Sequence, residues 1–474
     1  MALACAAAAV STACVHVDPQ QGVATVGELV AARTPYPVTW LRSEEDRTAI
    51  AIEIDRRLEA PLDPTAAIEV SLLGNPRVQA LYEEIGVSAA DVVAAATVSN
   101  PVLSAEVFWP GGGATTLEAG VAQNVLSLVM RPARRRLAET QYRRAQLQVA
   151  AEVLEHAAEV EVAYWELVAA EHAVELRGTI ADAAEAASEL ATRMRAAGTA
   201  SELDAARERA LHEMTLVALR RAEGDRVSAR ERLARLLGLE SADAEAFSTP
   251  ARLPDLPATD PSLDGLELQA VEERLDLQAA GREVEALAQA LGITRKWRWF
   301  VLAELGIEAE RELEGEWLVG PKVTLQLPIF DHRRGELRRR EAELRQVEHR
   351  LRGLALEIRS QVREARESLL LARDLVRRYR EVVIPLRERV VALLQQRHDF
   401  MLAGAFELLE ARSEEFESYE EYLHAVRDYY VARARLARAV GGRLPGPAPS
   451  EAPAVPAPAA PSPTHQHDGT GGAS

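Results

Sequence analysis

The chain has 474 residues, a formal net charge of −18 and only 5% aromatic residues. Alanine, leucine, glutamate and arginine are abundant, which is typical of long helices rather than of several compact domains. The acidic balance argues against a nucleic-acid partner, because phosphate binding needs a net basic face. The two cysteines, Cys5 and Cys14, lie near the N-terminus, which excludes a disulfide framework or a Cys-based metal site farther along the chain.

Residues 1–14 resemble the end of a bacterial lipoprotein signal. A run of small apolar residues ends at Ser11-Thr12-Ala13-Cys14, with a small residue before the cysteine that would carry the lipid. The positive region that opens a secretory signal is missing, and the apolar run is short. Two interpretations stay open: a signal with lipidation at Cys14 and a misplaced start, or a plain disordered end.

Residues 15–64 form a mixed lead-in, and residues 442–474 are rich in Pro, Ala, Ser and Gly. The composition of the second segment cannot pack a core, so it is predicted to be a disordered tail. After the N-terminal segment, no stretch approaches the roughly 20 apolar residues of a membrane-spanning helix. Any insertion into a membrane must therefore use strands.

Between lead-in and tail lie two copies of one pattern, residues 65–240 and 265–441, joined by a linker at 241–264. Each copy has a short helix, two alternating strands, a very long helix, a turn marked by glycine and a returning helix. The turn sequences show the repeat best: Ala197-Gly198 precedes Glu202-Leu203-Asp204, and Ala403-Gly404 precedes Glu407-Leu408-Leu409-Glu410. The offset of roughly 205 residues is far too long for a solenoid, so the chain has two large similar halves.

The predicted helices are unusually long, at about residues 131–196 and 201–238 in the first copy, and 333–399 and 405–440 in the second. A helix over residues 132–196 would extend roughly 100 Å. In the second copy, apolar residues recur at seven-residue spacing from Leu337 to Ala372, which predicts a coiled coil. Such helices must lie along a neighbour, most simply the returning helix, and they build a rod or a tube.

Four segments alternate apolar and polar residues and predict strands at about residues 99–109, 115–127, 297–308 and 316–328. Each has about the length of a tilted strand that crosses a bilayer, with one face for lipid and one for water. Four of the six tryptophans lie in these segments, mostly near their ends, which suits an aromatic girdle at the membrane interface. They are Trp109, Trp297, Trp299 and Trp317.

The alternative interpretation is two soluble hairpins that are half-buried on the helices. Against it, the apolar faces are long, and the helices offer only narrow stripes to cover them. Four strands cannot close a barrel, and an open edge in lipid would leave backbone groups without partners. Three copies would supply twelve strands, enough for a barrel with an aqueous lumen. The predicted fold is therefore mainly α, with a membrane β-barrel contribution.

The order and spacing of several motifs resemble those of the TolC family of outer-membrane efflux proteins, from about residue 65 to 441. The motifs are Asn75-Pro76-Arg77-Val78-Gln79, Ser99-Asn100-Pro101-Val102-Leu103, the stretch from Gly320-Pro321-Lys322 to Leu327-Pro328-Ile329-Phe330-Asp331, and the two turn motifs. The resemblance implies a homotrimer with a twelve-stranded barrel in outer-membrane lipid and a helical tube in the periplasm. It also implies docking onto the periplasmic adaptor of an inner-membrane efflux pump. The lead-in and Cys14 look closest to the heavy-metal or multidrug branch.

The resemblance assigns roles to both turns. Gly198, Glu202, Leu203, Asp204, Gly404, Leu408 and Leu409 would form the adaptor-docking tips. Glu407 and Glu410 match the acidic residues that narrow the periplasmic aperture of the family, although here Glu replaces Asp and the turn is about three residues shorter. Rings of carboxylates in a narrow pore favour cations. The alternative is that both are solvated charges at the first turn of a helix, where the helix dipole favours acids.

The sequence contains no phosphate loop, dinucleotide fingerprint or catalytic triad, so we predict neither an enzyme nor a cofactor or metal site. The leading hypothesis is a passive conduit for substrates such as metal cations or drugs. One alternative is a periplasmic adaptor, although no lipoyl-like or barrel segments flank a single central hairpin. The other is a coiled-coil scaffold of an envelope complex, which would require another role for the four strands.

Overall fold

The computed structural model describes residues 17–109, 115–240, 244, 247–257, 263–300, 302–312, 315–326, 328–400 and 402–444. Several sequence predictions lie outside these residues. They concern the signal-like segment with Cys14 and the tail beyond Leu444.

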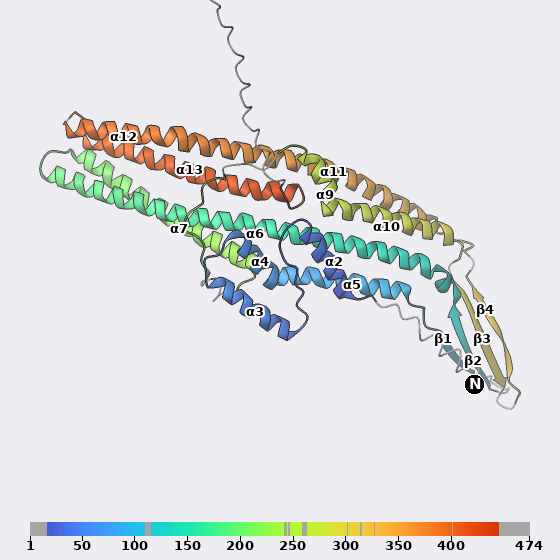
Figure 1. Ribbon diagram of the computed structural model, residues 1–474. Helices are drawn as coiled ribbons and strands as arrows, with labels where there is room; N and C mark the ends of the chain where they lie inside the picture. The colour runs from blue at the N-terminus through green and yellow to red at the C-terminus, as the bar shows by residue number, and fades with distance from the viewer. Residues whose placement is uncertain are drawn as a thin grey trace, which may run out of the picture.

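The molecule is long and narrow, with a small sheet at one end and two helical turns at the other (Figure 1). The first copy contains α5 (Pro76–Ala96), β1 (Val102–Phe108), β2 (Thr116–Asn124), α6 (Val125–Ala196) and α7 (Glu202–Leu237). The second contains α10 (Leu275–Trp297), β3 (Ala303–Glu312), β4 (Leu318–Leu325), α11 (Arg334–Arg378), the π-helical turn η1 (Tyr379–Val383), α12 (Ile384–Asp399) and α13 (Ala405–Ala439). The remaining helices are α2 (Pro19–Ala31), α3 (Glu44–Leu58), α4 (Pro64–Gly74) and α9 (Leu266–Glu273). The predicted combination of a mainly helical chain and a small antiparallel sheet is confirmed.

The four long helices lie side by side. Helix α6 contacts α7 and α13, and α13 in turn contacts α11 and α12. The contacts therefore run in the order α7, α6, α13 and then α11 with α12, so that α7 and the α11–α12 helix are the two ends of this series and form the outer edges of the layer. No helix in the described part of the chain is long and apolar enough to cross a membrane.

Two predictions about the long helices were wrong. Helix α6 begins at Val125, six residues earlier than predicted, because the Asn124 side chain accepts a hydrogen bond from Ser127 N and caps the helix. Pro132 therefore lies inside the helix rather than at its start. The predicted helix 333–399 is interrupted by η1, which ends at Val383, two residues before Pro385; proline has no N–H to continue the regular ladder.

The predicted strand 297–308 was also displaced. Trp297 is the last residue of α10, and Trp299 lies in the turn that follows, so neither tryptophan belongs to a strand. Strand β3 begins at Ala303, opposite Leu325, and extends to Glu312, opposite Thr116. Cross-strand partners decide these limits, because β2 gives way to α6 after Asn124 and β4 ends at Leu325.

The densest core lies where the lead-in helices pack on the middle of α6. Trp165 of α6 stacks on Tyr430 of α13, with ring centroids 4.2 Å apart, and Tyr164 meets the Trp165 ring edge-on. Toward the turns, where α6 lies against α7 and α13, most buried residues of α6 are alanines, which let helices approach closely: Ala181, Ala184, Ala187 and Ala191. Large side chains therefore separate the helices at mid-length, and small side chains separate them near the turns.

A buried polar network joins the start of the first copy to its end. Asn75 caps α5 by accepting from Arg77 N at 2.8 Å, and its amide donates to Leu236 O at 2.7 Å. The Ser71 hydroxyl also donates to Leu236 O, at 2.6 Å, and its oxygen lies 2.6 Å from His156 Nε2. The Asn-Pro motif therefore ties the end of α7 to α4 and α5.

The same network requires a neutral histidine. Because the Ser71 hydroxyl donates to Leu236, its oxygen accepts from His156 Nε2, and the proton of the imidazole is placed on Nε2. His156 Nδ1 is buried and has no partner among the described residues, so a second proton there would be unsatisfied. Burial, with a smaller contribution from the charge of Arg77, lowers the pKa of His156 to about 4.

The stability of the fold should therefore decrease in mild acid. The unfolded chain takes up a proton at His156 near pH 6.5, whereas the folded chain does so only near pH 4. Stability is thus lost as the pH falls through this window, by about 3 kcal/mol in total. Urea unfolding at pH 7 and pH 5 measures the loss, and His156→Gln should remove this part of it. An unchanged pH dependence in the variant would assign the effect to other groups.

Candidate functional site

The sheet joins the two copies of the repeat. Its strand order is β1-β2-β3-β4, all antiparallel, so the central pair consists of β2 from the first copy and β3 from the second. The sheet projects beyond the ends of the helices (Figure 1). Strands β1 and β4 each have a neighbour on one side only within the described part of the chain.

One face of the sheet is apolar and uncovered. The register places Leu103 beside Val121, Val121 beside Ile307 and Ile307 beside Pro321. The exposed large apolar residues on this face share this alternation: Leu103, Val107, Val121, Leu305, Ile307, Val319, Val323 and Leu325. Ile307, near the centre, is 63% exposed. A single chain thus presents a continuous apolar surface to its surroundings.

The opposite face is acidic. Glu106 lies beside Glu118, and Glu118 lies beside Glu310, so three carboxylates form one row across three strands. Glu304, Glu308 and Glu312 share this face by strand alternation. Among the strand residues on this face, Lys322 is the one basic residue. Its Nζ contacts Glu308 Oε1 at 2.6 Å. Like charges placed directly opposite each other disfavour pairing, so this face needs water or cations nearby.

The tryptophans mark both ends of the sheet. Trp109 follows β1 and Trp317 precedes β4 at the end far from the helices, while Trp297 and Trp299 lie at the helical end. Trp109 is 78% exposed, and Trp299 and Trp317 are about half exposed. Nine residues of β2 span about 30 Å at 3.3 Å per residue, close to the hydrocarbon thickness of a bilayer.

The first turn lies at the opposite end of the molecule, between α6 and α7 (Figure 1). Gly198 adopts a left-handed conformation, with φ 75°, directly after the last residues of α6. The Ser201 side chain caps α7, and the Asp204 carboxylate accepts from both the hydroxyl and the backbone N–H of Ser201. These hydrogen bonds lower the pKa of Asp204. Asp204 therefore has a structural role in the turn, whereas Glu202 and Leu203 are exposed.

The second turn, between α12 and α13, is built differently. Gly404 precedes α13 without a side-chain cap, and Leu402 N donates to Arg397 O at 2.8 Å. Glu407 and Glu410 are exposed on the first turns of α13, while Leu408 and Leu409 are partly buried. Two further apolar residues of this turn, Phe400 and Leu402, are 77% and 68% exposed. The sequence-based prediction did not include them, although two large apolar residues beside a glycine turn can indicate a contact site.

Both outer edges of the helical layer carry exposed apolar residues. On α7 they are Leu203, Met214, Val217 and Val227, and on the α11–α12 edge they are Leu371, Leu375, Leu386, Val390 and Leu393. We call these sets the α7 stripe and the α12 stripe. The predicted seven-residue seam of α11 faces inward instead, and Ile358, Ala365 and Ala372 are buried there. A second stripe on the same helix indicates a second neighbour.

Part of the chain matches the model of a known protein family. Residues 70–239 match the model of the family described as outer membrane efflux protein, which confirms the predicted resemblance. The predicted location in the outer membrane agrees with this family. No protein of curated function matches the sequence.

Several solved structures share the fold. The outer-membrane channel OprN is 18% identical with a TM-score of 0.66, and the match covers 91% of this chain and 97% of that one. The CmeC outer membrane channel of Campylobacter jejuni is 12% identical with a TM-score of 0.70, covering 83% and 87%. The MtrE outer membrane channel of Neisseria gonorrhoeae, solved in its open state, is 18% identical with a TM-score of 0.63, covering 79% and 88%. At these identities the likeness establishes the fold.

Proposed function

We propose that this chain, whose residues 70–239 match the model of the outer membrane efflux protein family, is one of three identical protomers of a passive exit duct. Three sheets would close a twelve-stranded barrel in the outer membrane, with the apolar faces toward lipid and the acidic faces toward a water-filled lumen. The helical layers would continue the duct through the periplasm.

The observation that carries this proposal is the sheet with one lipid-like face, one acidic face and two edges that lack a neighbour. An edge strand in hydrocarbon leaves N–H and C=O groups unsatisfied, at several kcal/mol per group. Pairing β1 of one copy with β4 of the next would satisfy both edges in the same contact. Closure also gives the carboxylates of Glu106, Glu118 and Glu310 access to water.

The two stripes support the same assembly. The α7 stripe and the α12 stripe lie on opposite edges of one layer and differ in sequence, so contact between them is head-to-tail. Head-to-tail contacts form a closed ring when the rotation between copies returns to its start. The open sheet edges and the apolar helix edges therefore both support this arrangement of neighbours.

The two turns at the far end would dock onto the periplasmic adaptor of an inner-membrane efflux pump. Leu203 at the first turn, with Phe400 and Leu402 at the second, offers apolar contacts there, and Glu202 and Glu407 offer charge. The cargo, whether metal cations or drugs, would be chosen by the pump. The rival function of an adaptor is disfavoured because this chain has two long hairpins that share one sheet.

Detergent extraction and native mass spectrometry test the assembly. We expect the protein in the outer-membrane fraction, released by detergent as a complex of three chains that heat separates into single chains. A single chain recovered from the aqueous fraction, with its tryptophans packed against helix, would contradict the duct.

Glu407 and Glu410 should bind cations at the periplasmic aperture of such a ring. Three copies would bring six carboxylates around one narrow opening, which favours multivalent cations. In single-channel recordings, the double variant Glu407→Gln, Glu410→Gln should raise the concentration of a trivalent cation that gives half-block by about tenfold, equivalent to 1.4 kcal/mol.

The matched control replaces Glu45 and Glu59, two exposed glutamates on the lead-in around α3, with glutamine. This control should leave the block unchanged. If the aperture variant also leaves it unchanged, Glu407 and Glu410 are solvated charges at the start of a helix.

A further inference from the structure

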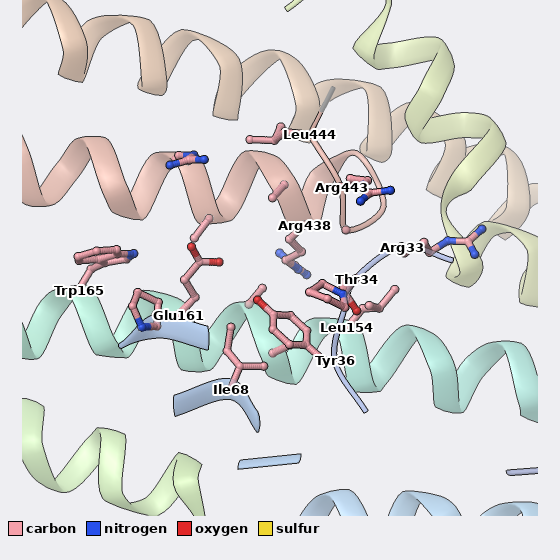
Figure 2. A pocket seen from close by; sticks show the side chains of 18 of the residues that line it. Arg33, Thr34, Tyr36, Ile68, Leu154, Glu161, Trp165, Arg438, Arg443 and Leu444 are labelled. Carbon is pink, nitrogen blue, oxygen red and sulfur yellow. The ribbon is translucent and has the colours of Figure 1, made fainter. Parts of the chain in front are cut away.

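A cavity of about 540 Å³ lies at mid-length between α6 and α13. The lead-in segment at 33–36 covers one side, Pro257 of the linker contributes to the wall, and the last described residues, 442–444, cover another side (Figure 2). The cavity is distant from both the sheet and the turns, so the proposed duct does not explain it.

The walls of the cavity are aromatic and rich in hydrogen-bond donors. Tyr36, Trp165 and Tyr429 line it. Trp165 is only 8% exposed, and its Nε1 is buried without a hydrogen-bond partner among the described residues. Figure 2 shows this indole beside the Glu161 side chain, and the indole opposes the rise that burial causes in the pKa of the Glu161 carboxyl. A buried indole N–H that lacks a well-aligned acceptor favours a ligand that offers carbonyl oxygens.

Arginines give the cavity a basic character. Arg33 is paired with Glu273, and Arg438 is paired with Glu155. Arg433 and Arg443 also line the cavity, against a single acid, Glu161. Burial raises the pKa of the Glu161 carboxyl, and nearby Arg433 and the Trp165 indole oppose that rise. The wall therefore accepts a segment that offers carbonyl oxygens and a negative charge.

A proline-rich peptide matches these walls. X-Pro peptides have strong carbonyl acceptors and few N–H donors, and their preformed extended helix docks onto aromatic grooves. Residues 445–463 of this chain contain eight prolines and one charged residue, Glu451. The segment starts directly after Leu444, which is part of the cavity wall.

We propose that residues 445–463 bind back into this cavity of the same chain, with their carbonyls on the donors of Trp165, Tyr36 and Arg433 and with Glu451 near the arginines. Glu451 lies seven residues beyond Leu444, which itself lines the cavity, so the tether can extend about 22 Å from that wall at 3.1 Å per residue. A short tether also gives an effective concentration in the millimolar range, so a dissociation constant of about 1 mM is enough for occupancy.

Photocrosslinking in the full chain tests the proposal. A benzoylphenylalanine in place of Ala158, on the α6 wall, should crosslink to residues 445–463 at least about tenfold more often than the same group in place of Ala222, which lines a different cavity between α6, α7 and α13. Mass spectrometry of the digested product locates the crosslink. Equal yields from both positions, or no crosslink to the tail, would overturn the proposal.

Two further readouts separate the alternatives. On a denaturing gel the crosslinked product should remain a single chain, whereas a covalent dimer would mean that the tail comes from a neighbouring copy and would overturn binding in the same chain. Glu451→Lys should lower the crosslink yield severalfold, because it places a positive charge near Arg433 and Arg443. The control Ser462→Lys, near the end of the segment, should leave the yield unchanged; an equal loss in both variants would contradict the predicted position of Glu451.

Discussion

Ile307→Arg should abolish stable insertion of the protein into the outer membrane. Ile307 lies near the middle of β3 on the apolar face and is exposed in the single chain. A lipid-facing arginine at the bilayer midplane costs about 2–4 kcal/mol, and a ring of three copies carries the change three times, about 6–12 kcal/mol in all. The amount of heat-sensitive complex in the outer-membrane fraction, compared with total protein, measures the effect.

The matched control for this prediction is Gly320→Arg. Gly320 is adjacent to Pro321, the cross-strand partner of Ile307, but it lies on the acidic face, and nothing lies within 4 Å of an added Cβ. An arginine there would face the lumen and its carboxylates, so insertion should persist. Equal loss in both variants would mean that the two faces do not differ in environment, and the membrane assignment would be wrong.

The double variant Val217→Glu, Leu386→Glu should separate the complex into single chains. Val217 lies on the α7 stripe and Leu386 on the α12 stripe, and both are exposed in the single chain. Each apolar side chain buried in a contact contributes about 1.5–3 kcal/mol, and two glutamates brought into the same contact add an unpaired charge penalty. Because the proposed ring of three copies would repeat this contact three times, the expected total loss is about 9–18 kcal/mol.

Native mass spectrometry in mild detergent reports the number of chains in each complex. Ile52→Glu, a change of similar exposure on α3 and outside both stripes, is the control and should leave the number unchanged. A double variant that still runs as a complex of three would show that the stripes do not form the contact between copies.

Sequence periodicity predicted the elements whose side chains alternate or repeat over many residues. Period-two alternation identified strands later found at Val102–Phe108 and Leu318–Leu325, and the sequence also indicated a very long helix that ends at Ala196. Alternation failed at Trp297 and Trp299 because a few residues at the end of a helix can alternate by chance. The start of β3 was decided instead by its partners on β2 and β4, which the sequence of one strand does not contain.

Contacts between distant segments were beyond prediction. The buried polar network joins Ser71 to His156, 85 residues later, and to Leu236, 165 residues later. No local sequence pattern indicates these contacts. The aromatic cavity likewise depends on Tyr36, Trp165 and Tyr429 meeting across three elements. The turns could be located from the sequence, because glycines and acidic residues mark them. The capping role of Asp204 could not be predicted, because it depends on the position of the Ser201 side chain.

The two unlike edges of the helical layer have a genetic consequence. A copy damaged at only one edge, such as Leu386→Glu, keeps an intact α7 stripe and can still join a normal copy through it. Every proposed ring that includes such a copy would then lack one of its contacts between an α7 stripe and an α12 stripe. In a cell that makes normal and damaged chains equally and assembles them at random, only about one ring in eight would be wholly normal. Such an allele should therefore be dominant over the wild type.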